Sequence, residues 1–352
     1  MKIILATGGS GGHIFPALKT AEQLKKEGHE VFFVGALSSV EMRLRHSGFK
    51  CFILEVQGYS LKSFLRFIGL LTKALFKSKK IIRSLNPDIV VGFGSYSSFP
   101  VLFAASTAGI PTMIHEQNVI PGKANRLSAR FVNQIAVSFD ETRKAFPNRK
   151  VIFTGCPCHG DRPNVSKENI LKSFGLRDNR RTILVLGGSQ GSRYLNDVFF
   201  ESIPYLENIQ VIHATGKADE SSYAQKYLNL GIPHHVCAFL DPIERAYAVA
   251  DVVIGRAGAA TICELAAFGL PSLLIPYPFA HSHQAANARI LENAGVAVVI
   301  NQKEMNRQKL IDAVKRIVTQ GLTSEAVHKR LEGLFVDNPT EQLVNAIVAM
   351  KP

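Results

Sequence analysis

Two groups of residues in the first half of the chain are of the types that move protons in enzymes. His13 ends the glycine-rich segment Gly8–Gly12, and the series His115-Glu116-Gln117-Asn118 follows an apolar stretch, Thr112–Ile114. Histidine is the side chain best suited to proton transfer near neutral pH, and a carboxylate is an alternative. We therefore take His13 and Glu116 as candidate general bases. A capping role for His13 and a solvated turn for the second group stay open.

Two glycine-rich segments follow apolar stretches that predict β-strands. Ile3–Ala6 leads into Gly8–Gly12, and Ile183–Leu186 leads into Gly187-Gly188-Ser189-Gln190-Gly191. Glycine lets the backbone approach a ligand closely, and the start of a helix attracts anions. The first segment lacks the G-x-G-x-x-G spacing, and no acidic residue ends the next strand at Val34-Gly35, which disfavours nicotinamide binding. Pro16 marks the point where we expect the first helix to begin.

A third loop, Arg256–Thr261, follows the predicted strand Val252–Ile254 and opens a helix that contains Glu264. Its backbone amides could hold a diphosphate, and Glu264 could bind ribose hydroxyls. Glu264 could instead be an ordinary first-turn acid that the helix dipole favours. Gln284 and Asn287 lie three residues apart at a later helix start, so their amides can face one side together.

The nearest approach to a metal-binding pattern is Cys156-Pro157-Cys158-His159. It has no second pair of ligands, and no Asp-x-Asp pair occurs, so reduced structural thiols explain it better. We expect no metal and no cofactor, which leaves backbone amides, helix dipoles and cations to stabilise a leaving diphosphate. The five cysteines, an odd number, also favour a reducing compartment.

Predicted strands, which alternate with helical segments along the chain, could position these residues. The apolar stretches that predict strands are Ile3–Ala6, Val31–Val34, Ile89–Val91, Thr112–His115, Thr182–Leu186, Val211–Ala214, Val252–Ile254 and Ser272–Ile275. Strands alternating with helices indicate parallel sheets, and 352 residues exceed what one core usually holds. We therefore predict an α/β protein of two tandem Rossmann-like domains with an interdomain cleft.

Gly and Pro residues gather at Thr154–Asn164 and predict the domain boundary. The domains would be residues 1–158 and 159–352. Thr340–Met350 predicts a last helix, whose apolar side could pack on either domain.

The chain carries a formal charge of +13, and residues 58–83 contain no acid. Basic and apolar residues mix there as in a surface that lies on anionic lipid headgroups, and we prefer this to a merely solvated basic face. The residues that we assign to membrane contact are Phe64, Arg66, Phe67, Leu71, Lys73, Leu75, Phe76 and Lys77. Nucleic acid is disfavoured because no recognised binding motif accompanies the charge. No apolar run is long enough for a signal peptide or a membrane span, so we expect a soluble or peripheral protein.

Taken together, these motifs resemble the MurG family of glycosyltransferases over essentially the whole chain. The match rests on Gly8 to Pro16, His115 to Asn118, Gly187 to Gly191, Arg256 to Glu264, and His283-Gln284 with Asn287-Ala288. The resemblance implies the GT-B fold, with the acceptor domain first, the UDP-GlcNAc domain second and a last helix, near residues 340–352, that crosses back. It also implies inverting transfer of N-acetylglucosamine from UDP-GlcNAc to lipid I, without an obligatory metal, at the cytoplasmic face of the cell inner membrane.

The resemblance further implies which residues contact UDP-GlcNAc. These are Ser10, Gly11, Gly12 and Asn118 at the sugar or diphosphate, Ser189 at a phosphate, Leu240 near the uracil, Ala259, Ala260, Thr261, Ile262, Cys263 and Glu264 at phosphate and ribose, and Gln284 at the sugar hydroxyls. The family's Gly-Asn-Pro-x-Arg segment is Gly155-Cys156-Pro157-Cys158-His159 here, so His159 stands where an arginine is usual. Imidazole holds an anion less firmly than guanidinium, which puts this donor contact in doubt.

Two other functions fit parts of the sequence. A GT-B transferase that glycosylates diacylglycerol would share the donor loops and the basic stretch, although the group from His115 to Asn118 speaks against it. A non-catalytic nucleotide-sugar binding subunit would bind UDP-GlcNAc and leave lipid I unchanged. Measuring sugar transfer into lipid I separates these possibilities.

Overall fold

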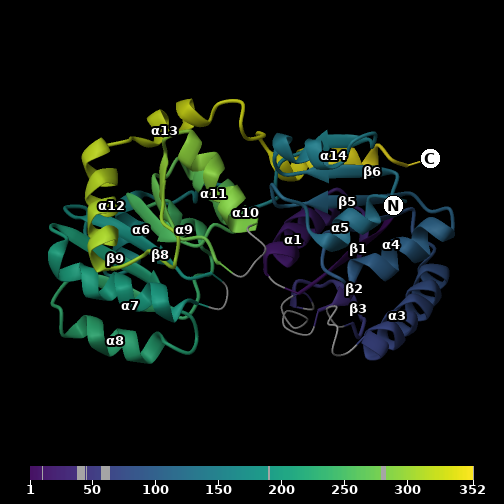
Figure 1. Cartoon of the computed structure of the whole chain (residues 1–352), viewed down its shortest axis with the longest axis horizontal. Helices are drawn as coiled ribbons and strands as arrows, with labels where there is room; N and C mark the ends of the chain where they lie inside the picture. Colours follow the sequence, from purple (N-terminus) through teal and green to yellow (C-terminus); the bar gives the residue numbers. More distant parts are fainter. Residues whose placement is uncertain are drawn as a thin grey trace. The chain divides into compact units, whose positions relative to one another are not determined.

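The computed structural model of the chain describes residues 1–9, 11–37, 44, 46–56, 64–188, 191–278 and 283–351, without the side chains of residues 64–67. Ser10 and Ser189, and the side chains of Phe64, Arg66 and Phe67, therefore lie outside the described part. The chain forms two compact units (Figure 1). The first unit contains residues 1–158 and 334–352, and the second contains residues 159–333.

The first unit is built on a seven-stranded parallel sheet with the strand order β3-β2-β1-β4-β5-β6-β7. The strands are β1 (Lys2–Gly8), β2 (Glu30–Ala36), β3 (Lys50–Ile53), β4 (Ile89–Gly92), β5 (Thr112–Glu116), β6 (Gln134–Val137) and β7 (Val151–Phe153). The helices are α1 (Gly11–Lys26), α3 (Phe64–Leu85), α4 (Ser98–Thr107), α5 (Lys123–Ser128), the 3-10 helix η2 (Asp140–Ala145) and α14 (Pro339–Val348). Neighbouring strands of this sheet pair in parallel, so their carboxyl ends all lie at one edge of the sheet.

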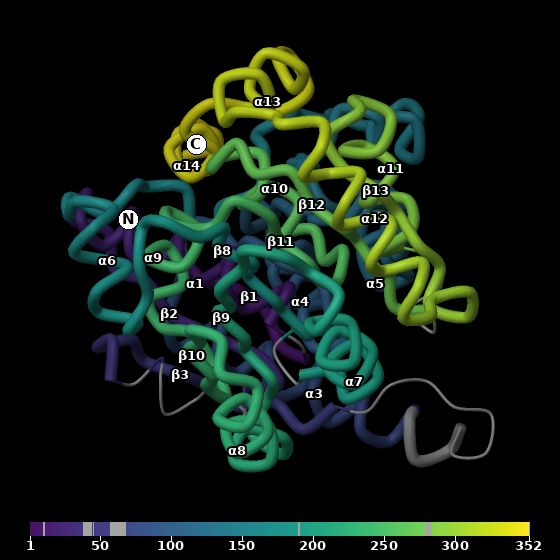
Figure 2. The backbone as a smooth tube through the Cα atoms, turned by 90° about the vertical axis from the view of Figure 1, so that its left-hand side faces the viewer, coloured from purple at the N-terminus to yellow at the C-terminus, as the bar shows by residue number. Residues whose placement is uncertain are grey.

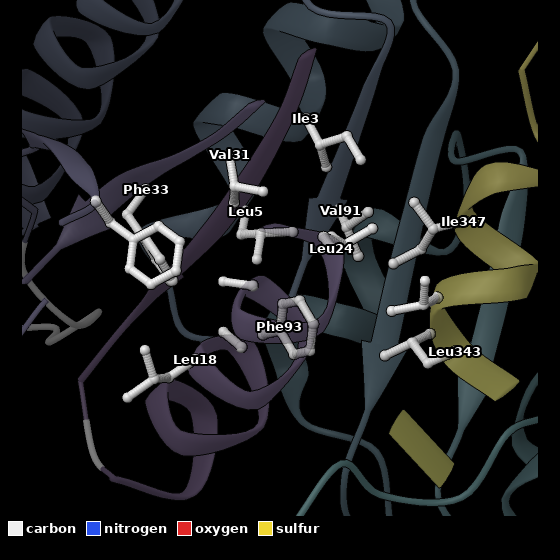
Figure 3. Packing of buried hydrophobic residues seen from close by; sticks show 14 of the residues in the cluster. Ile3, Leu5, Leu18, Leu24, Val31, Phe33, Val91, Phe93, Leu343 and Ile347 are labelled. Carbon is white, nitrogen blue, oxygen red and sulfur yellow. The ribbon is translucent and has the colours of Figure 1, made fainter. Parts of the chain in front are cut away.

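Alternate residues of the central strands of this sheet enter two separate cores. Ile3 and Leu5 of β1 pack with residues of α1 and α14, whereas Ile4 and Ala6 pack with residues of α3 and α4. Figure 3 shows Leu343 and Ile347 of α14 pointing toward the β-sheet residues of the first core. Because both faces are covered, consecutive residues in the middle of these strands are apolar, as is typical of parallel sheets.

The second unit repeats this plan with a six-stranded parallel sheet in the order β10-β9-β8-β11-β12-β13, which can be followed across Figure 2. The strands are β8 (Arg181–Leu186), β9 (Ile209–Ala214), β10 (His234–Cys237), β11 (Val252–Gly255), β12 (Ser272–Leu274) and β13 (Ala297–Val299). The helices are α6 (Lys167–Ser173), α7 (Arg193–Ser202), the 3-10 helix η3 (Ile203–Tyr205), α8 (Glu220–Leu228), α9 (Glu244–Tyr247), α10 (Ala259–Phe268), α11 (His283–Asn293), α12 (Arg307–Gln320) and α13 (Ser324–Leu331).

The predicted α/β class with two Rossmann-like domains is confirmed. The predicted last helix corresponds to α14, which belongs to the first unit. Four strands that we did not predict complete the sheets: β3, β6, β10 and β13. They have three or four residues each, and β3, β10 and β13 lie at sheet edges where burial is partial, so their apolar signal is weak.

Two local predictions were wrong. Strand β5 continues to Glu116, so His115 and Glu116 are buried strand residues and not part of the following loop. Helix α1 begins at Gly11, and Pro16 lies inside it. As the sixth residue of the helix, Pro16 removes the backbone hydrogen bond that an N–H at this position would donate to the carbonyl of Gly12.

None of the helices within the described ranges has the length and apolarity that crossing a bilayer requires.

Candidate active site

His13 lies in the first turn of α1, directly after β1 and its glycine-rich loop. Its ring is half-buried, and its Nδ1 lies 3.0 Å from Oε1 of Gln117. The loop after β4 passes close to the ring, because a Cβ built on Gly94 would lie 3.0 Å from His13 Nδ1 and Cε1. Gly94 also has a φ of +88°, which side chains other than glycine rarely adopt. The His13 ring is therefore confined between two loops at the carboxyl ends of β1, β4 and β5.

His115 is fully buried at the end of β5. Its Nε2 donates to the carbonyl of Gly155 at 2.9 Å, and its Nδ1 lies 3.0 Å from Nε2 of Gln117. Burial lowers the pKa of His115 to about 4, and the bond to Gly155 opposes this shift only in part. At neutral pH the ring is uncharged and holds one proton.

The carboxylate of Glu116 is 1% exposed and is bound on both oxygens by its own loop. Oε1 accepts from the backbone N–H of Asn118 at 2.9 Å and from its Nδ2 at 3.2 Å. Oε2 accepts from the backbone N–H of Gly122 at 3.0 Å and from Nδ2 of Asn125 at 2.8 Å. A carboxylate has about four acceptor sites, and all four are used. This geometry favours an orienting role for Glu116, in which it positions Asn118, over a role as general base.

Gly11 and Gly12 open helix α1, with partly or fully exposed surfaces, so their backbone can meet a ligand. Asn118 is half-buried, and its carbonyl accepts from Oγ1 of Thr142 at 3.2 Å. The first unit therefore places His13, Asn118 and the two glycines after β1 and β5, at the carboxyl edge of one sheet.

In the second unit, a glycine-rich loop follows β8. Gly188 and Gly191 have φ values of +88° and +76°, and a Cβ on Gly191 would lie 2.3 Å from the carbonyl oxygen of Thr215. Only glycine fits there, which explains the sequence pattern in terms of close backbone packing.

Arg256, which we did not single out from the sequence, is a buried cation next to this loop. It is 9% exposed, and its two terminal nitrogens donate to the carbonyl of Ile275 at 3.1 Å and to Oγ of Ser192 at 2.6 Å. Its guanidinium also lies 5.6 Å from the ring of Tyr277. Burial lowers the pKa of Arg256, and within the described residues no carboxylate forms an ion pair with it. A cation held by neutral partners is suited to an anionic ligand.

Helix α10 begins at Ala259 after the extended residue Gly258, so its first backbone N–H groups can face an anion. Ala260 and Thr261 are half-buried, whereas Ala259, Ile262 and Cys263 belong to the core. The predicted phosphate contacts in this segment would therefore come from the backbone and from Thr261 more than from apolar side chains. Leu240, predicted near the uracil, is 6% exposed in the loop that follows β10.

Gln284 and Asn287 both hold the loop between β11 and α10. Oε1 of Gln284 accepts from the backbone N–H of Ala257 at 3.2 Å and from that of Tyr277 at 2.8 Å. Asn287 is fully buried and donates to the carbonyl of Ala257 at 3.2 Å. The two amides therefore face the same loop, and the amide of Asn287 is buried against the backbone of that loop.

Glu264 lies in the second turn of α10 and is 7% exposed, so it is not an ordinary first-turn acid. Burial raises its pKa, while nearby His159 and the hydroxyl of Tyr247 oppose this shift. Tyr247 donates to Glu264 Oε2 at 2.9 Å, and Nδ1 of His159 contacts Oε1 of Glu244. His159 is therefore engaged with the half-buried carboxylate of Glu244 and lies near the buried carboxylate of Glu264, both in its own unit.

The described ranges contain no cluster of three His, Cys, Asp or Glu residues that could hold a metal ion.

Helix α3, whose place in the first unit can be seen in Figure 1, carries an exposed face of basic side chains. Phe76 is 71% exposed at the centre of this face. The cations around it are exposed as well, namely Lys73, Lys77, Lys79, Lys80 and Arg83. Leu71 and Leu75 are half-buried at its edge, and the opposite side packs into the core through Ala74, Ile81 and Ile82.

Two family descriptions match most of the chain. Residues 3–137 match the glycosyltransferase family 28 N-terminal domain, and residues 182–343 match the glycosyltransferase family 28 C-terminal domain. These matches include the loops that contain His13, Glu116, Arg256 and Gln284, and they define the chain as a family 28 glycosyltransferase.

Relatives that match over nearly the whole chain narrow this class. A Thermodesulfovibrio yellowstonii protein named UDP-N-acetylglucosamine–N-acetylmuramyl-(pentapeptide) pyrophosphoryl-undecaprenol N-acetylglucosamine transferase is 40% identical over 331 residues, 91% of this chain and 90% of its own. A Bacillus subtilis protein with the same name is 31% identical over 100% of both chains. The crystal structure of Acinetobacter baumannii MurG is 27% identical, covers 99% of both chains and has a TM-score of 0.79. The chain belongs to the MurG family.

Proteins with other names also have a similar fold. A UDP-GlcNAc 2-epimerase from Neisseria meningitidis, solved with UDP-GlcNAc bound, has a TM-score of 0.67 over 99% of both chains at 14% identity. At that identity the likeness concerns the fold alone.

Proposed function

We propose that this chain transfers N-acetylglucosamine from UDP-GlcNAc to the C4 hydroxyl of N-acetylmuramic acid in lipid I, undecaprenyl-pyrophosphoryl-MurNAc-pentapeptide. The observation that supports this most is the 40% identity, over 91% of the chain, to a transferase whose name states that reaction. The arrangement of His13, Glu116 and Asn118 in the first unit agrees with this chemistry.

In the proposed mechanism, the C4 hydroxyl oxygen attacks the anomeric carbon of UDP-GlcNAc and inverts its configuration from α to β. The hydroxyl proton passes to His13, a new C–O bond forms, and the bond from the anomeric carbon to the diphosphate oxygen breaks. The electron pair of that bond leaves with UDP. His13 suits the base because its ring is held at the start of α1, whereas the four hydrogen bonds on Glu116 occupy that carboxylate.

Groups of the second unit are suited to the negative charge of the departing UDP. Backbone N–H groups at the start of α10 and the guanidinium of Arg256 are fixed in place before any ligand arrives, so they need not reorganise during the reaction. The side chain of Gln284 is held by two backbone N–H groups that donate to its Oε1. Its own amide N–H groups can then donate to the sugar hydroxyls. Because His159 is engaged with Glu244, it would contribute less to donor binding than an arginine.

The basic face of α3 would hold the enzyme on the anionic surface where lipid I resides, at the cytoplasmic face of the inner membrane. Phe76 provides an apolar side chain for the interface, and five exposed cations surround it.

The test is transfer of labelled N-acetylglucosamine by the purified chain, with lipid I and diacylglycerol offered in parallel. We expect labelled lipid II only, and we expect His13→Ala to lower kcat by about 100-fold to 10,000-fold, the range of general-base contributions. The matched control is His46→Ala, which removes an exposed histidine of the same unit.

Three results would contradict the proposal. A wild-type rate for His13→Ala would contradict the assignment of His13 as the general base. Transfer of the label to diacylglycerol would contradict the assignment of lipid I as the acceptor. Binding of UDP-GlcNAc with neither lipid modified would make the chain a binding subunit.

A further inference from the structure

A chain of three hydrogen bonds runs from the backbone of Gly155 to the ring of His13. Nε2 of His115 lies 2.9 Å from the carbonyl oxygen of Gly155, and Nδ1 of His115 lies 3.0 Å from Nε2 of Gln117. Oε1 of Gln117 then lies 3.0 Å from Nδ1 of His13. The two middle side chains are 0% and 1% exposed, so water does not compete for these bonds.

The carbonyl of Gly155, at one end of this series of hydrogen bonds, determines which group donates in every bond of the series. A carbonyl oxygen can only accept, so His115 must carry its proton on Nε2. Burial keeps His115 uncharged, with its pKa lowered to about 4, so Nδ1 holds no proton and must accept. The group of Gln117 that faces it is therefore the amide NH2, and the amide oxygen faces His13. Since that oxygen can only accept, the proton of a neutral His13 ring must lie on Nδ1.

A second carbonyl independently fixes the orientation of Gln117. Its Nε2 also donates to the backbone oxygen of His115 at 3.0 Å. Rotating the amide by 180° would place its oxygen against this carbonyl and against the Nδ1 lone pair of His115, which is two repulsions in a buried site. The direction of the bond to His13 thus rests on two backbone carbonyls, those of His115 and Gly155.

We propose that Gln117 and His115 are positioning residues that hold His13 in its Nδ1–H tautomer, so that Nε2 keeps the lone pair that accepts the proton of the acceptor hydroxyl. This inference rests on the proposed function for the identity of that hydroxyl. Within the described residues Nε2 of His13 makes no hydrogen bond, which agrees with a group reserved for substrate. We call the hydrogen-bonded series Gly155, His115 and Gln117 the relay. It carries no net charge, so it sets the tautomer of His13 without placing a carboxylate beside the ring.

The first experiment observes the tautomer directly. Long-range ¹⁵N–¹H correlation spectra of the full chain, labelled at its eleven histidines, show which ring nitrogen carries the proton at a pH where the rings are neutral. The spectrum of His13→Ala identifies the His13 signals by their absence. We expect the Nδ1–H pattern for His13, and an Nε2–H pattern in the unmodified chain would overturn the inference even if lipid II is formed normally.

The second experiment changes the relay with a pair of matched variants. Gln117→Met keeps the length of the side chain but removes the acceptor, so we expect loss of the Nδ1–H pattern and a fall in kcat on the order of 100-fold, with KM for UDP-GlcNAc unchanged. Gln117→Glu keeps an oxygen facing His13, and its other oxygen can replace the amide NH2 only as a protonated O–H that donates to His115. In that neutral form it should retain the Nδ1–H pattern and more of the activity than Gln117→Met.

Failure of the relay and failure of the proposed function give different results. If Gln117→Met keeps both the tautomer and kcat, the relay is overturned and the transferase remains. If the unmodified chain has the Nδ1–H pattern but His13→Ala transfers sugar at the wild-type rate, the base role is overturned. Should Gln117→Met fail to fold, the spectrum of the unmodified chain still decides the tautomer.

Discussion

At the scale of single residues, each unit contains one fully buried histidine among the residues that the structure describes. His115 serves the first unit, and His213 lies in β9 of the second with Nδ1 3.0 Å from the hydroxyl of Tyr227 and Nε2 3.1 Å from Oδ1 of Asn196. Burial lowers the pKa of His115 to about 4 and that of His213 to about 3. Both rings stay neutral over a pH range in which the unfolded chain would protonate them.

These two histidines predict how stability depends on pH. Below pH 6.5, the ordinary pKa of histidine, these two side chains bind protons in the unfolded state but not in the folded state. The free energy of unfolding must therefore fall as the pH falls. Lowering the pH from 6.5 to 4.5 should reduce the free energy of unfolding by on the order of 2 kcal/mol for each of the two histidines. Urea denaturation at several pH values measures the slope. The exposed control His46→Ala should leave it unchanged, and a flat profile over this window would contradict the burial argument.

Residue types could be predicted from the sequence more readily than residue roles. His13 and Glu116 stood out because protonatable side chains follow apolar strands, but whether Glu116 accepts a proton or holds a loop depends on four partners between Asn118 and Asn125. Gln117 was part of the same motif, yet its role depends on the direction of hydrogen bonds that only the folded backbone defines. Arg256 was named only as the first residue of a loop and received no role of its own, because its burial cannot be predicted from its position after a strand.

At the scale of elements, helix α14 completes a core that begins at the other end of the chain. Leu343, Val344 and Ile347 are fully buried in the cluster that contains Ile3 and Leu5. Figure 3 shows that their helix faces the sheet where α1 also packs. Its apolar side was visible in the sequence, but the sheet that it covers was not, because apolar periodicity does not identify a partner.

This packing predicts the cost of shortening one side chain of α14. Leu343→Ala should lower the free energy of unfolding by about 2–5 kcal/mol, because it leaves a cavity at a fully buried position. Asn345→Ala on the exposed side of the same helix should change it by less than about 0.5 kcal/mol. Equal effects of the two substitutions in thermal or urea denaturation would show that α14 does not contribute to this core.

Helix α3 makes a second prediction at this scale. Replacing Lys73 and Lys77 together by Gln should weaken binding to vesicles containing anionic lipid by about 2 kcal/mol, or roughly 30-fold, because each cation near such a surface contributes about 1 kcal/mol. The matched control is Lys315→Gln with Lys329→Gln, which removes the same charge from exposed positions of the second unit. An equal loss in both double variants, measured by vesicle sedimentation, would attribute binding to net charge and not to α3.

At the scale of the whole molecule, the repetition of strand, glycine-rich loop and helix was enough to predict two α/β units. The glycine-rich loops after β1 and β8 mark equivalent positions in two parallel sheets, and the sequence shows both. The boundary between the units was harder to predict in full, because the first unit takes back residues 334–352 after the second is complete. A division of the sequence into consecutive segments cannot represent such a return.

The return of the chain has a consequence for its synthesis on the ribosome. All residues of the second unit exist once residue 333 has been added, whereas the first unit still lacks one side of its core. Pro339 also packs against Gly155, since a Cβ built on Gly155 would lie 2.7 Å from Pro339 Cβ, so the residue beside that carbonyl is synthesised only after the second unit. Domains usually fold in the order in which they are translated. In this chain the unit that contains His13 is begun first, yet it cannot complete its core before the residues of the second unit have been made.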